Sequence, residues 1–204
     1  IDPGRAAAIG APRGFTQGGE DTVYLTAVDA EGNAVVLIQS LYEAFGACAM
    51  VPATGMLLHN RARGFTLKAD HPNVLAPGKR PYHTLHPAMI LRGGRPVILL
   101  GSPGADGQTQ TNIQLAIDLI DFGADAQQAN EAPRWRSNPD GSLMIENRFP
   151  EKTIEGLVTR GHDVRVLEAY APIMGSSQVI AIDRGNGVLQ AGADPRRQAY
   201  AIGR

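Results

Sequence analysis

The chain of 204 residues contains 24 Gly, 14 Pro and one Cys, and its 19 Lys and Arg against 20 Asp and Glu leave a formal charge of −1. An apolar share of 43% is typical of a globular protein and excludes a disordered one. The near-zero charge argues against nucleic acid or an anionic membrane as the main partner, and the apolar runs are too short to span a membrane.

The N-terminal part divides into a segment without periodicity and a predicted hairpin. The chain begins Ile1-Asp2-Pro3 without an initiator Met, so we expect a piece of a longer protein. Residues 1–21 are rich in small residues and Pro, which indicates a linker or an extended arm. Two apolar, β-branched runs at 22–28 and 34–40 flank turn residues and predict a β-hairpin.

The middle of the chain passes from predicted loops to a second hairpin and a helix. Residues 42–87 alternate short apolar patches with Gly, Pro and Asn and look loop-rich. Runs at 89–92 and 96–100 flank a Gly pair and predict two strands. A helix is expected from about 109 to 122, where apolar residues recur at helical spacing.

The C-terminal third alternates predicted helices and strands. They are a short helix at 126–130, a strand at 143–147, a helix at 151–160, a strand at 164–167 and a hairpin at 178–183 and 188–191. Because strands come first, then helices and then strands again, we predict an α+β fold with antiparallel pairing rather than a doubly wound sheet.

The sequence carries no signature of a metal or cofactor site. His83 and His86 lie three apart without a carboxylate or Cys partner at ligand-like spacing, so we interpret the histidines as loop residues. Gly101, Gly104 and Gly107 precede the central helix, but their spacing matches neither the dinucleotide fingerprint nor the P-loop. Two interpretations of this loop stay open: a structural turn, or backbone N–H groups that stabilise an oxyanion.

Thr22 is the candidate nucleophile, since no G-x-S-x-G elbow is present. A Thr hydroxyl needs a base beside it, and an α-amino group, with a pKa of about 7.7–8.0, is suited to that task. Cleavage between Asp21 and Thr22 would place nucleophile and base on one residue. The alternative is that Thr22 simply opens a strand. In the uncleaved chain the nitrogen is part of a peptide bond and has no basic lone pair.

Motifs that are weak singly occur in a specific order from Thr22 to Arg196. They include Val28-Asp29-x-x-Gly32-Asn33-Ala34-Val35, Phe45-Gly46, Gly55-Met56-Leu57-Leu58-x-Asn60, Pro77-Gly78-Lys79-Arg80-Pro81, Gly101-Ser102-Pro103-Gly104, Asn130-x-Ala132-Pro133-Arg134, Gly175-Ser176-Ser177-Gln178 and Gly192-Ala193-Asp194-Pro195-Arg196. In this order they resemble the small subunit of γ-glutamyltranspeptidases, which are N-terminal-nucleophile hydrolases.

The resemblance implies a fold and a partner that this chain cannot supply alone. The family fold is a four-layer αββα sandwich, completed by a large subunit from the same precursor. Residues 1–21 would be a pre-cleavage linker or the end of the large-subunit region, and residues 22–204 the small-subunit catalytic region. A dimer of such heterodimers is possible. The compartment stays open; we favour the cytoplasm, with a periplasmic or secreted protein as the alternative.

The resemblance also implies catalytic roles. Thr22 matches the Thr that autoproteolysis exposes, and Ser40 the hydroxyl that hydrogen-bonds the amine of the nucleophile. Gly104 and Ala105 fall on the Gly-Gly pair whose N–H groups form the oxyanion hole. Ala still supplies an N–H, so this departure is mild if the backbone angle suits a residue with a Cβ.

The substrate positions depart further from the family. His83 and Thr84 fall on a Ser-Ser pair, of which the first contacts the substrate carboxylate and the second packs near the acyl centre. With them, Tyr42, Arg61 and Gly64 replace the amide and carboxylate side chains that hold a γ-glutamyl group.

Gly64 offers no negative charge for an α-ammonium, whereas Arg61 would bind a carboxylate. We therefore expect an acyl group without the α-amine, as in the cephalosporin-acylase-like and oxamate-amidohydrolase-like branch. The alternative is that Arg61 and His83 are ordinary surface loop residues.

Three functions remain for comparison. The first is a self-processing amidohydrolase or acyltransferase that acts on a small-molecule amide through Thr22. The second is authentic γ-glutamyl transfer or glutathione hydrolysis with a differently built pocket. The third is an unprocessed, inactive homologue that serves as a structural subunit.

Overall fold

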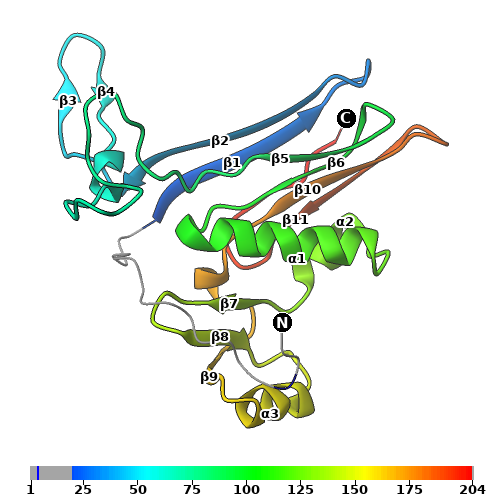
Figure 1. Ribbon diagram of the computed structural model, residues 1–204. Coiled ribbons are helices and arrows are strands. Elements are labelled where there is room, and N and C mark those ends of the chain that lie inside the picture. The colour runs from blue at the N-terminus through cyan, green and yellow to red at the C-terminus, as the bar shows by residue number, and fades with distance from the viewer. Residues whose placement is uncertain (1–3, 5–19, 204) are drawn as a thin grey trace.

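The computed structural model describes residue 4 and residues 20–203 of the chain. The expected linker over residues 1–21 therefore lies outside the described residues, except for residue 4 and for its last two residues, which already belong to the first strand. The described part combines helices with small sheets, as the α+β prediction requires (Figure 1).

The predicted N-terminal hairpin is present and longer than expected. β1 (Glu20–Val28) pairs antiparallel with β2 (Ala34–Glu43). Side chains alternate between the two faces of a strand. Tyr24 is buried on the inner face, whereas Leu25 and its cross-strand partner Leu37 are exposed on the outer one. Both faces of this hairpin are thus apolar.

The main sheet consists of the two other predicted hairpins. Its strands, in the spatial order β11-β10-β6-β5, are β5 (Ala88–Arg92), β6 (Arg95–Gly101), β10 (Gln178–Asp183) and β11 (Val188–Ala193). All neighbours pair antiparallel, as predicted. Strands β6 and β10 join the two hairpins. Gly101 of β6 pairs directly with Gln178 of β10, although 76 residues lie between them in the sequence.

Helices cover one face of this sheet and the β1–β2 hairpin lies against the other (Figure 1). α1 (Gln108–Ile120) and α2 (Ala126–Glu131) match the predicted helices. Five buried side chains form the core between helices and sheet: Leu100, Leu115, Ala126, Ala129 and Val179. α2 starts with a capping box, in which Asp125 accepts hydrogen bonds from the N–H groups of Gln127 and Gln128.

A second, smaller sheet corrects the prediction of purely antiparallel pairing. It contains β7 (Trp135–Ser137), β8 (Ser142–Glu146) and β9 (Asp163–Leu167), and β8 pairs with β9 in parallel. α3 (Glu151–Thr159) lies between these two strands in the chain, and such a crossover returns the second strand in the same direction. The three-residue strand β7 is too short to show a sequence pattern and was not predicted.

Two glutamines of α1 bind the edge of this small sheet. Gln114 donates to the Trp135 carbonyl and accepts from the Trp135 N–H, and Gln110 makes the same pair of bonds with Ser137. The side-chain amides thus take the place of a neighbouring strand. They satisfy backbone groups of an edge that would otherwise be open.

Residues 44–87 are mostly loop, as predicted. They contain the short strands β3 (Met50–Val51) and β4 (Met56–Leu57) and the 3-10 turn η1 (Arg61–Gly64). The β3–β4 arm projects from the layered body (Figure 1). Two further 3-10 turns, η2 (Ala105–Gly107) and η3 (Pro172–Met174), precede α1 and β10.

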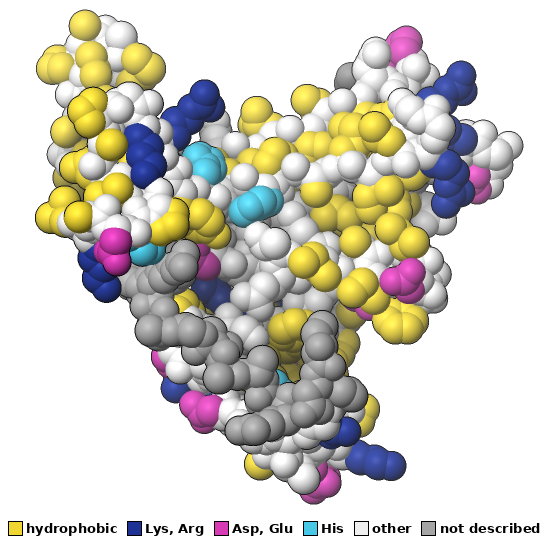
Figure 2. Space-filling model, viewed as in Figure 1, with side chains coloured by type: hydrophobic (Ala, Val, Ile, Leu, Met, Phe, Trp, Pro, Cys, Tyr) yellow, Lys and Arg dark blue, Asp and Glu magenta, His cyan; other side chains and the backbone are white. Residues whose placement is uncertain are grey.

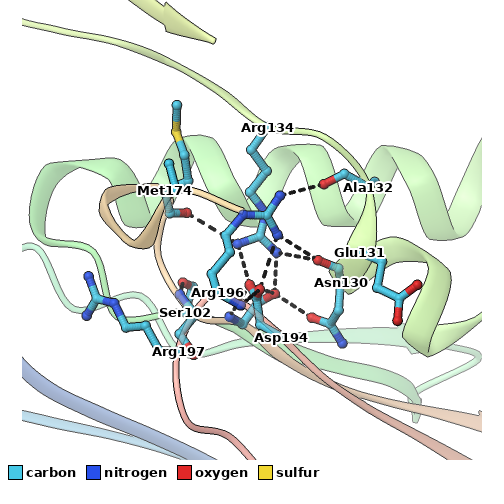
Figure 3. Close-up of polar contacts among 12 residues, drawn as sticks. Ser102, Asn130, Glu131, Ala132, Arg134, Met174, Asp194, Arg196 and Arg197 are labelled. Carbon is cyan, nitrogen blue, oxygen red and sulfur yellow. Dashed lines mark hydrogen bonds and ion pairs between the residues drawn. The ribbon is translucent and has the colours of Figure 1, made fainter. Parts of the chain in front are cut away.

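Four buried charged side chains connect the two sheets, and Figure 3 labels three of them, Arg134, Asp194 and Arg196. Arg196 forms two hydrogen bonds of 2.7 Å to the two carboxylate oxygens of Glu146, and its Nη1 lies 3.1 Å from Asp194. Arg134 lies 2.5 Å from the other oxygen of Asp194. The two arginines also donate to the carbonyls of Asn130 and Ala132 at the C-terminal end of α2, where a cation is favourable.

The two arginines differ in how well their charge is compensated. Burial lowers the pKa of Arg134 to about 10, and the charge of Asp194 opposes that shift only in part. Burial alone would also lower the pKa of Arg196, but the hydrogen bonds with Glu146 and the charge of Asp194 raise it above its usual value. Arg134 therefore depends most on Asp194.

We predict that Asp194→Asn strongly destabilises the protein, because it leaves Arg134 as a buried charge without its ion-pair partner. Removing one partner of a buried pair costs about 3–5 kcal/mol. Asp163→Asn is the matched control, since the Asp163–Arg165 pair is exposed and worth about 0–1 kcal/mol. Urea unfolding of both variants checks this, and equal midpoints would show that the buried network contributes little.

Candidate active site

Thr22 and Ser40 face each other across the hairpin. They are paired in the register of β1 and β2, and the Thr22 hydroxyl donates a hydrogen bond of 3.0 Å to Ser40 Oγ. Both side chains are partly buried on the inner face of the hairpin. The two residues predicted to act together from the resemblance are therefore in direct contact.

A β-bulge lies at the bond that the sequence predicts to be cleaved. Asp21 pairs with Tyr42 and Thr22 with Ser40, so Leu41 is the extra residue of β2 and the register shifts between Asp21 and Thr22. Tyr42 has a φ of 82°, which a residue with a Cβ rarely adopts. Its N–H donates to Ser40 Oγ at 2.9 Å. The Ser40 hydroxyl oxygen therefore accepts hydrogen bonds from both Thr22 and Tyr42 at the bulge. Bulges are frequent beside active sites.

Arg61 is buried next to Tyr42 and Thr84. Only 5% of Arg61 is exposed, its guanidinium lies 4.9 Å from the centre of the Tyr42 ring, and Nη1 donates to Thr84 Oγ1 at 3.0 Å. Among the described residues no carboxylate forms an ion pair with it. Burial lowers the pKa of Arg61, and Tyr42 acts in the opposite direction. Arg61 is thus a buried cation rather than a surface residue, so that alternative is wrong for Arg61.

His83 is exposed at the edge of this cluster. Its Nδ1 accepts the N–H of Leu85, which leaves Nε2 as the protonated nitrogen of the neutral ring. Partial burial, and then the charges of Arg61, His86 and His59, lower the pKa of His83. The predicted substrate-position residues Tyr42, Arg61, His83 and Thr84 are therefore brought together, and Gly64 ends the same 3-10 turn that begins with Arg61.

Gly104 and Ala105 form a sharp turn between β6 and α1. Their φ angles are 146° and 45°, both in the region that favours glycine. For Ala105 this conformation costs about 1–2 kcal/mol, so the condition under which an Ala would be a mild departure from the family's second glycine is not met. A strained turn of this kind leaves N–H groups available to an anion.

Ser102 and Gly175 brace this turn, and sequence reasoning gave neither a role. Ser102 is fully buried; its Oγ donates to the Pro103 carbonyl at 2.6 Å and accepts the Ser176 N–H at 3.0 Å. A Cβ on Gly175, whose φ is 95°, would lie 2.9 Å from the Pro103 carbonyl oxygen and still closer to Ser102 Oγ. Both residues stand in motifs used for the resemblance, but a single sequence does not indicate that the motifs touch.

Asp106 and Tyr82 are further neighbours that the sequence did not single out. Asp106 follows Ala105 in η2, and after burial its negative charge is the next cause that raises the pKa of both Tyr42 and Tyr82. The turn at Gly104 and Ala105, which is the predicted oxyanion turn, thus lies close to the Tyr42–Arg61 cluster. The predicted catalytic and substrate positions, spread over more than 80 residues, belong to one region.

Within residue 4 and residues 20–203, no three His, Cys, Asp or Glu side chains gather as metal ligands, and no helix is long and apolar enough to cross a membrane. Figure 2 shows hydrophobic side chains exposed over the β3–β4 arm and over the layered body. The region around Thr22 and Arg61 therefore remains the best candidate for an active site.

The sequence is similar to a family model and to several known proteins. The sequence matches the family model described as gamma-glutamyltranspeptidase over residues 6–204. It is 44% identical over 190 residues to the glutathione hydrolase-like YwrD proenzyme of Bacillus subtilis (strain 168), covering 91% of this chain and 36% of that protein. It is 40% identical over 202 residues to the oxamate amidohydrolase proenzyme of Klebsiella pneumoniae, covering 96% of this chain and 38% of that protein.

A solved structure shares the fold. The crystal structure of cephalosporin acylase from Bacillus halodurans superposes with a TM-score of 0.80 at 38% identity, covering 85% of this chain and 32% of that one. The chain thus spans little more than a third of the length of the curated relatives it matches. Together the family model, the relatives and the shared fold confirm the predicted resemblance: the chain belongs to the γ-glutamyltranspeptidase family.

Proposed function

We propose that the chain is the catalytic part of a self-processing amidohydrolase with Thr22 as its N-terminal nucleophile. The observation that carries this proposal is the Thr22–Ser40 contact at a β-bulge, directly at the Asp21–Thr22 bond. In the precursor the Thr22 hydroxyl attacks the Asp21 carbonyl. As the ester between Asp21 and Thr22 Oγ1 forms, the C–N bond breaks, the nitrogen takes the hydroxyl proton and the Thr22 amine is freed. Water then hydrolyses the ester, which releases the Asp21 carboxylate and restores the Thr22 hydroxyl.

In the processed enzyme the Thr22 amine acts as general base for its own hydroxyl. Oγ1 attacks the carbonyl carbon of the substrate amide while the amine takes the hydroxyl proton. The N–H groups of Gly104 and Ala105 stabilise the negative charge on the tetrahedral oxygen. The protonated amine returns its proton to the leaving nitrogen as the amide bond breaks. Water then hydrolyses the acyl ester on Thr22, or an amine accepts the acyl group.

We propose a substrate whose acyl group ends in a carboxylate and lacks an α-amine. A buried Arg61 without an ion-pair partner among the described residues supports this, because its fork can hold a carboxylate with two hydrogen bonds. Thr84 and the Tyr42 ring fix the guanidinium plane. The names of two relatives, oxamate amidohydrolase and cephalosporin acylase, agree with an amide substrate.

Authentic γ-glutamyl transfer or glutathione hydrolysis remains the second candidate. The name of the Bacillus subtilis relative, glutathione hydrolase-like, favours it, and so does the proximity of the Asp106 charge to Tyr42. A carboxylate near Tyr42 would offer an α-ammonium a partner that Gly64 cannot provide. An unprocessed, inactive homologue is the third candidate, and the cleavage test below separates it from the other two.

We further propose that the rest of a precursor, as large subunit, adds a fourth layer over the outer face of the β1–β2 hairpin. Helices, main sheet and hairpin already follow one another as an α–β–β order. The outer side chains Val23, Leu25, Val35 and Leu37 are each 43–53% exposed. A contiguous apolar face of this kind typically marks an interaction site. Two such heterodimers can pair, as the resemblance implies.

We predict that Thr22→Ala abolishes both cleavage and turnover, because it removes the nucleophile of both reactions. Activity should fall by a factor of about 10³ or more, whereas Thr22→Ser keeps a hydroxyl and retains both steps at reduced rate. Intact mass and N-terminal sequencing of the full-length protein measure cleavage. Thr26→Ala is the matched control in the same strand, and cleavage that persists in Thr22→Ala would rule out the nucleophile.

We predict that wild-type enzyme hydrolyses a glutaryl anilide faster than the γ-glutamyl anilide. Arg61→Met should raise KM for the glutaryl compound about 10–100-fold, because a hydrogen-bonded charge contributes about 1.5–3 kcal/mol. Arg63→Met is the matched control, since Arg63 is exposed and pairs with Glu43 instead. Preference for the γ-glutamyl compound would favour the second candidate.

We predict that Leu25→Asp weakens association with the large subunit, whereas Val158→Asp, at a similarly exposed position on α3, does not. Full burial of a Leu side chain is worth about 1.5–3 kcal/mol, and a charge in its place would also be desolvated. The urea concentration at which the cleaved subunits separate in gel filtration measures the effect. Equal values for both variants would place the partner elsewhere.

A further inference from the structure

We infer that Tyr24 is a positioning residue whose ring, packed on the backbone of Gly101, sets the distance between the Thr22 hydroxyl and the oxyanion turn. The inference rests on the proposed function, since it concerns the two halves of the proposed catalytic site. The two halves come from different layers. The nucleophile lies on the β1–β2 hairpin, and Gly104 and Ala105 follow the main sheet.

Tyr24 is tied to the nucleophile through the strand itself. Thr22 and Tyr24 are two positions apart in β1, so their side chains lie on the same face, roughly 7 Å from each other along the strand. Tyr24 is only 9% exposed and is the one buried hydrophobic residue that β1 and β2 contribute to the core of the described chain. It is therefore the main inward contact of the hairpin.

Gly101 is tied to the oxyanion turn in the same way. It is the last residue of β6, three positions before Gly104. A Cβ at Gly101 would lie 2.7 Å from both Cδ2 and Cζ of the Tyr24 ring, and closer still to Cε2. The φ of Gly101 is not in the left-handed region, so glycine is required here for space. The ring thus rests directly on the strand that leads into the turn.

The Gly101 side of this contact cannot move away freely. Gly101 is paired with Gln178 of β10, and the adjoining Ser102 is held by Ser176. The turn is therefore fixed between the Tyr24 ring on the hairpin side and the Gly175-Ser176 segment. At Gly101 and at Gly175 the approach is so close that a single added Cβ atom would overlap with the neighbouring residue.

Tyr24 acts through its volume and not through proton transfer. Burial raises the pKa of its hydroxyl far above the usual value, so the side chain stays a neutral phenol at any working pH. A planar aromatic ring defines a separation through its size and rigidity, because its atoms cannot move relative to one another, whereas Leu is shorter and leaves space. The expected consequence of a changed separation is a lower kcat, since stabilisation of the transition state depends on the geometry of the oxyanion donors.

The test uses Gly101→Ala, the double variant Gly101→Ala/Tyr24→Leu, and Tyr24→Phe, all in the full-length protein. The readout is kcat and KM of the cleaved enzyme with the anilide that the wild type hydrolyses faster. Gly101→Ala should lower kcat at least ten-fold with KM within two-fold. The double variant, in which Leu leaves room for the new methyl group, should recover at least five-fold of that loss. Tyr24→Phe should stay within two-fold of wild type.

Gly156→Ala on α3 is the matched control, because its Cβ would meet only the flexible end of Arg160. A double variant no faster than Gly101→Ala, or a Gly101→Ala enzyme with wild-type kcat, would overturn the inference. Should Gly101→Ala fail to fold, Tyr24→Leu against Tyr24→Phe decides: loss of the ring must lower kcat at least five-fold more than loss of the hydroxyl. Failure of the proposed function itself is recognised separately, by cleavage or activity that survives in Thr22→Ala.

Discussion

The burial of two guanidinium groups against two carboxylates is the constraint on which the C-terminal half depends. The four side chains are each at most 4% exposed: Arg134, Arg196, Asp194 and Glu146. Each charge therefore needs its ion-pair partner in place before water can be excluded from the network. Glu146 comes from β8, Asp194 follows the end of β11, and the helix α2 offers its terminal carbonyls. The network therefore forces the small sheet, the main sheet and α2 to assemble together. Because a buried ion pair recovers little beyond its own desolvation, we expect the network to contribute a unique arrangement more than net stability.

The same network reaches the candidate site through the backbone. Arg134 donates to the Met174 carbonyl and to Ser177 Oγ, so it holds both ends of the Gly175-Ser176 segment. That segment in turn fixes Ser102 and thereby the turn at Gly104 and Ala105. Such support matters because Ala105 and Tyr42 occupy left-handed conformations that the local sequence disfavours. Strained backbone persists only where neighbouring contacts determine it, and here both strained residues lie beside positions that the proposed chemistry uses.

Local pattern in the sequence sufficed for the three hairpins and for α1, α2 and α3, because apolar periodicity and turn residues act over a few positions. It failed for the direction of β8 and β9, which depends on the crossover through α3, and for β7, whose edge is completed by Gln110 and Gln114 from a distant helix. The contact of Ser40 with Thr22 was expected from the family resemblance, and the pairing of β1 with β2 places the two residues opposite each other. Two other features could not be predicted from the sequence: the contact of Ser102 with Ser176, 74 positions away, and the burial of Arg61. Both arise only when separate loops pack together.

Strand β1 links assembly to catalysis in the proposed enzyme. Its side chains alternate with a period of two, so Thr22 and Tyr24 face the main sheet while Val23 and Leu25 face outward. A shift of one residue would exchange the two sets: the nucleophile would leave the oxyanion turn, and the apolar outer face would lose its side chains. A partner that covers Val23 and Leu25 therefore stabilises the only register in which Thr22 reaches Ser40. Under the proposed function, binding of the large subunit and placement of the nucleophile are two consequences of one pairing between β1 and β2.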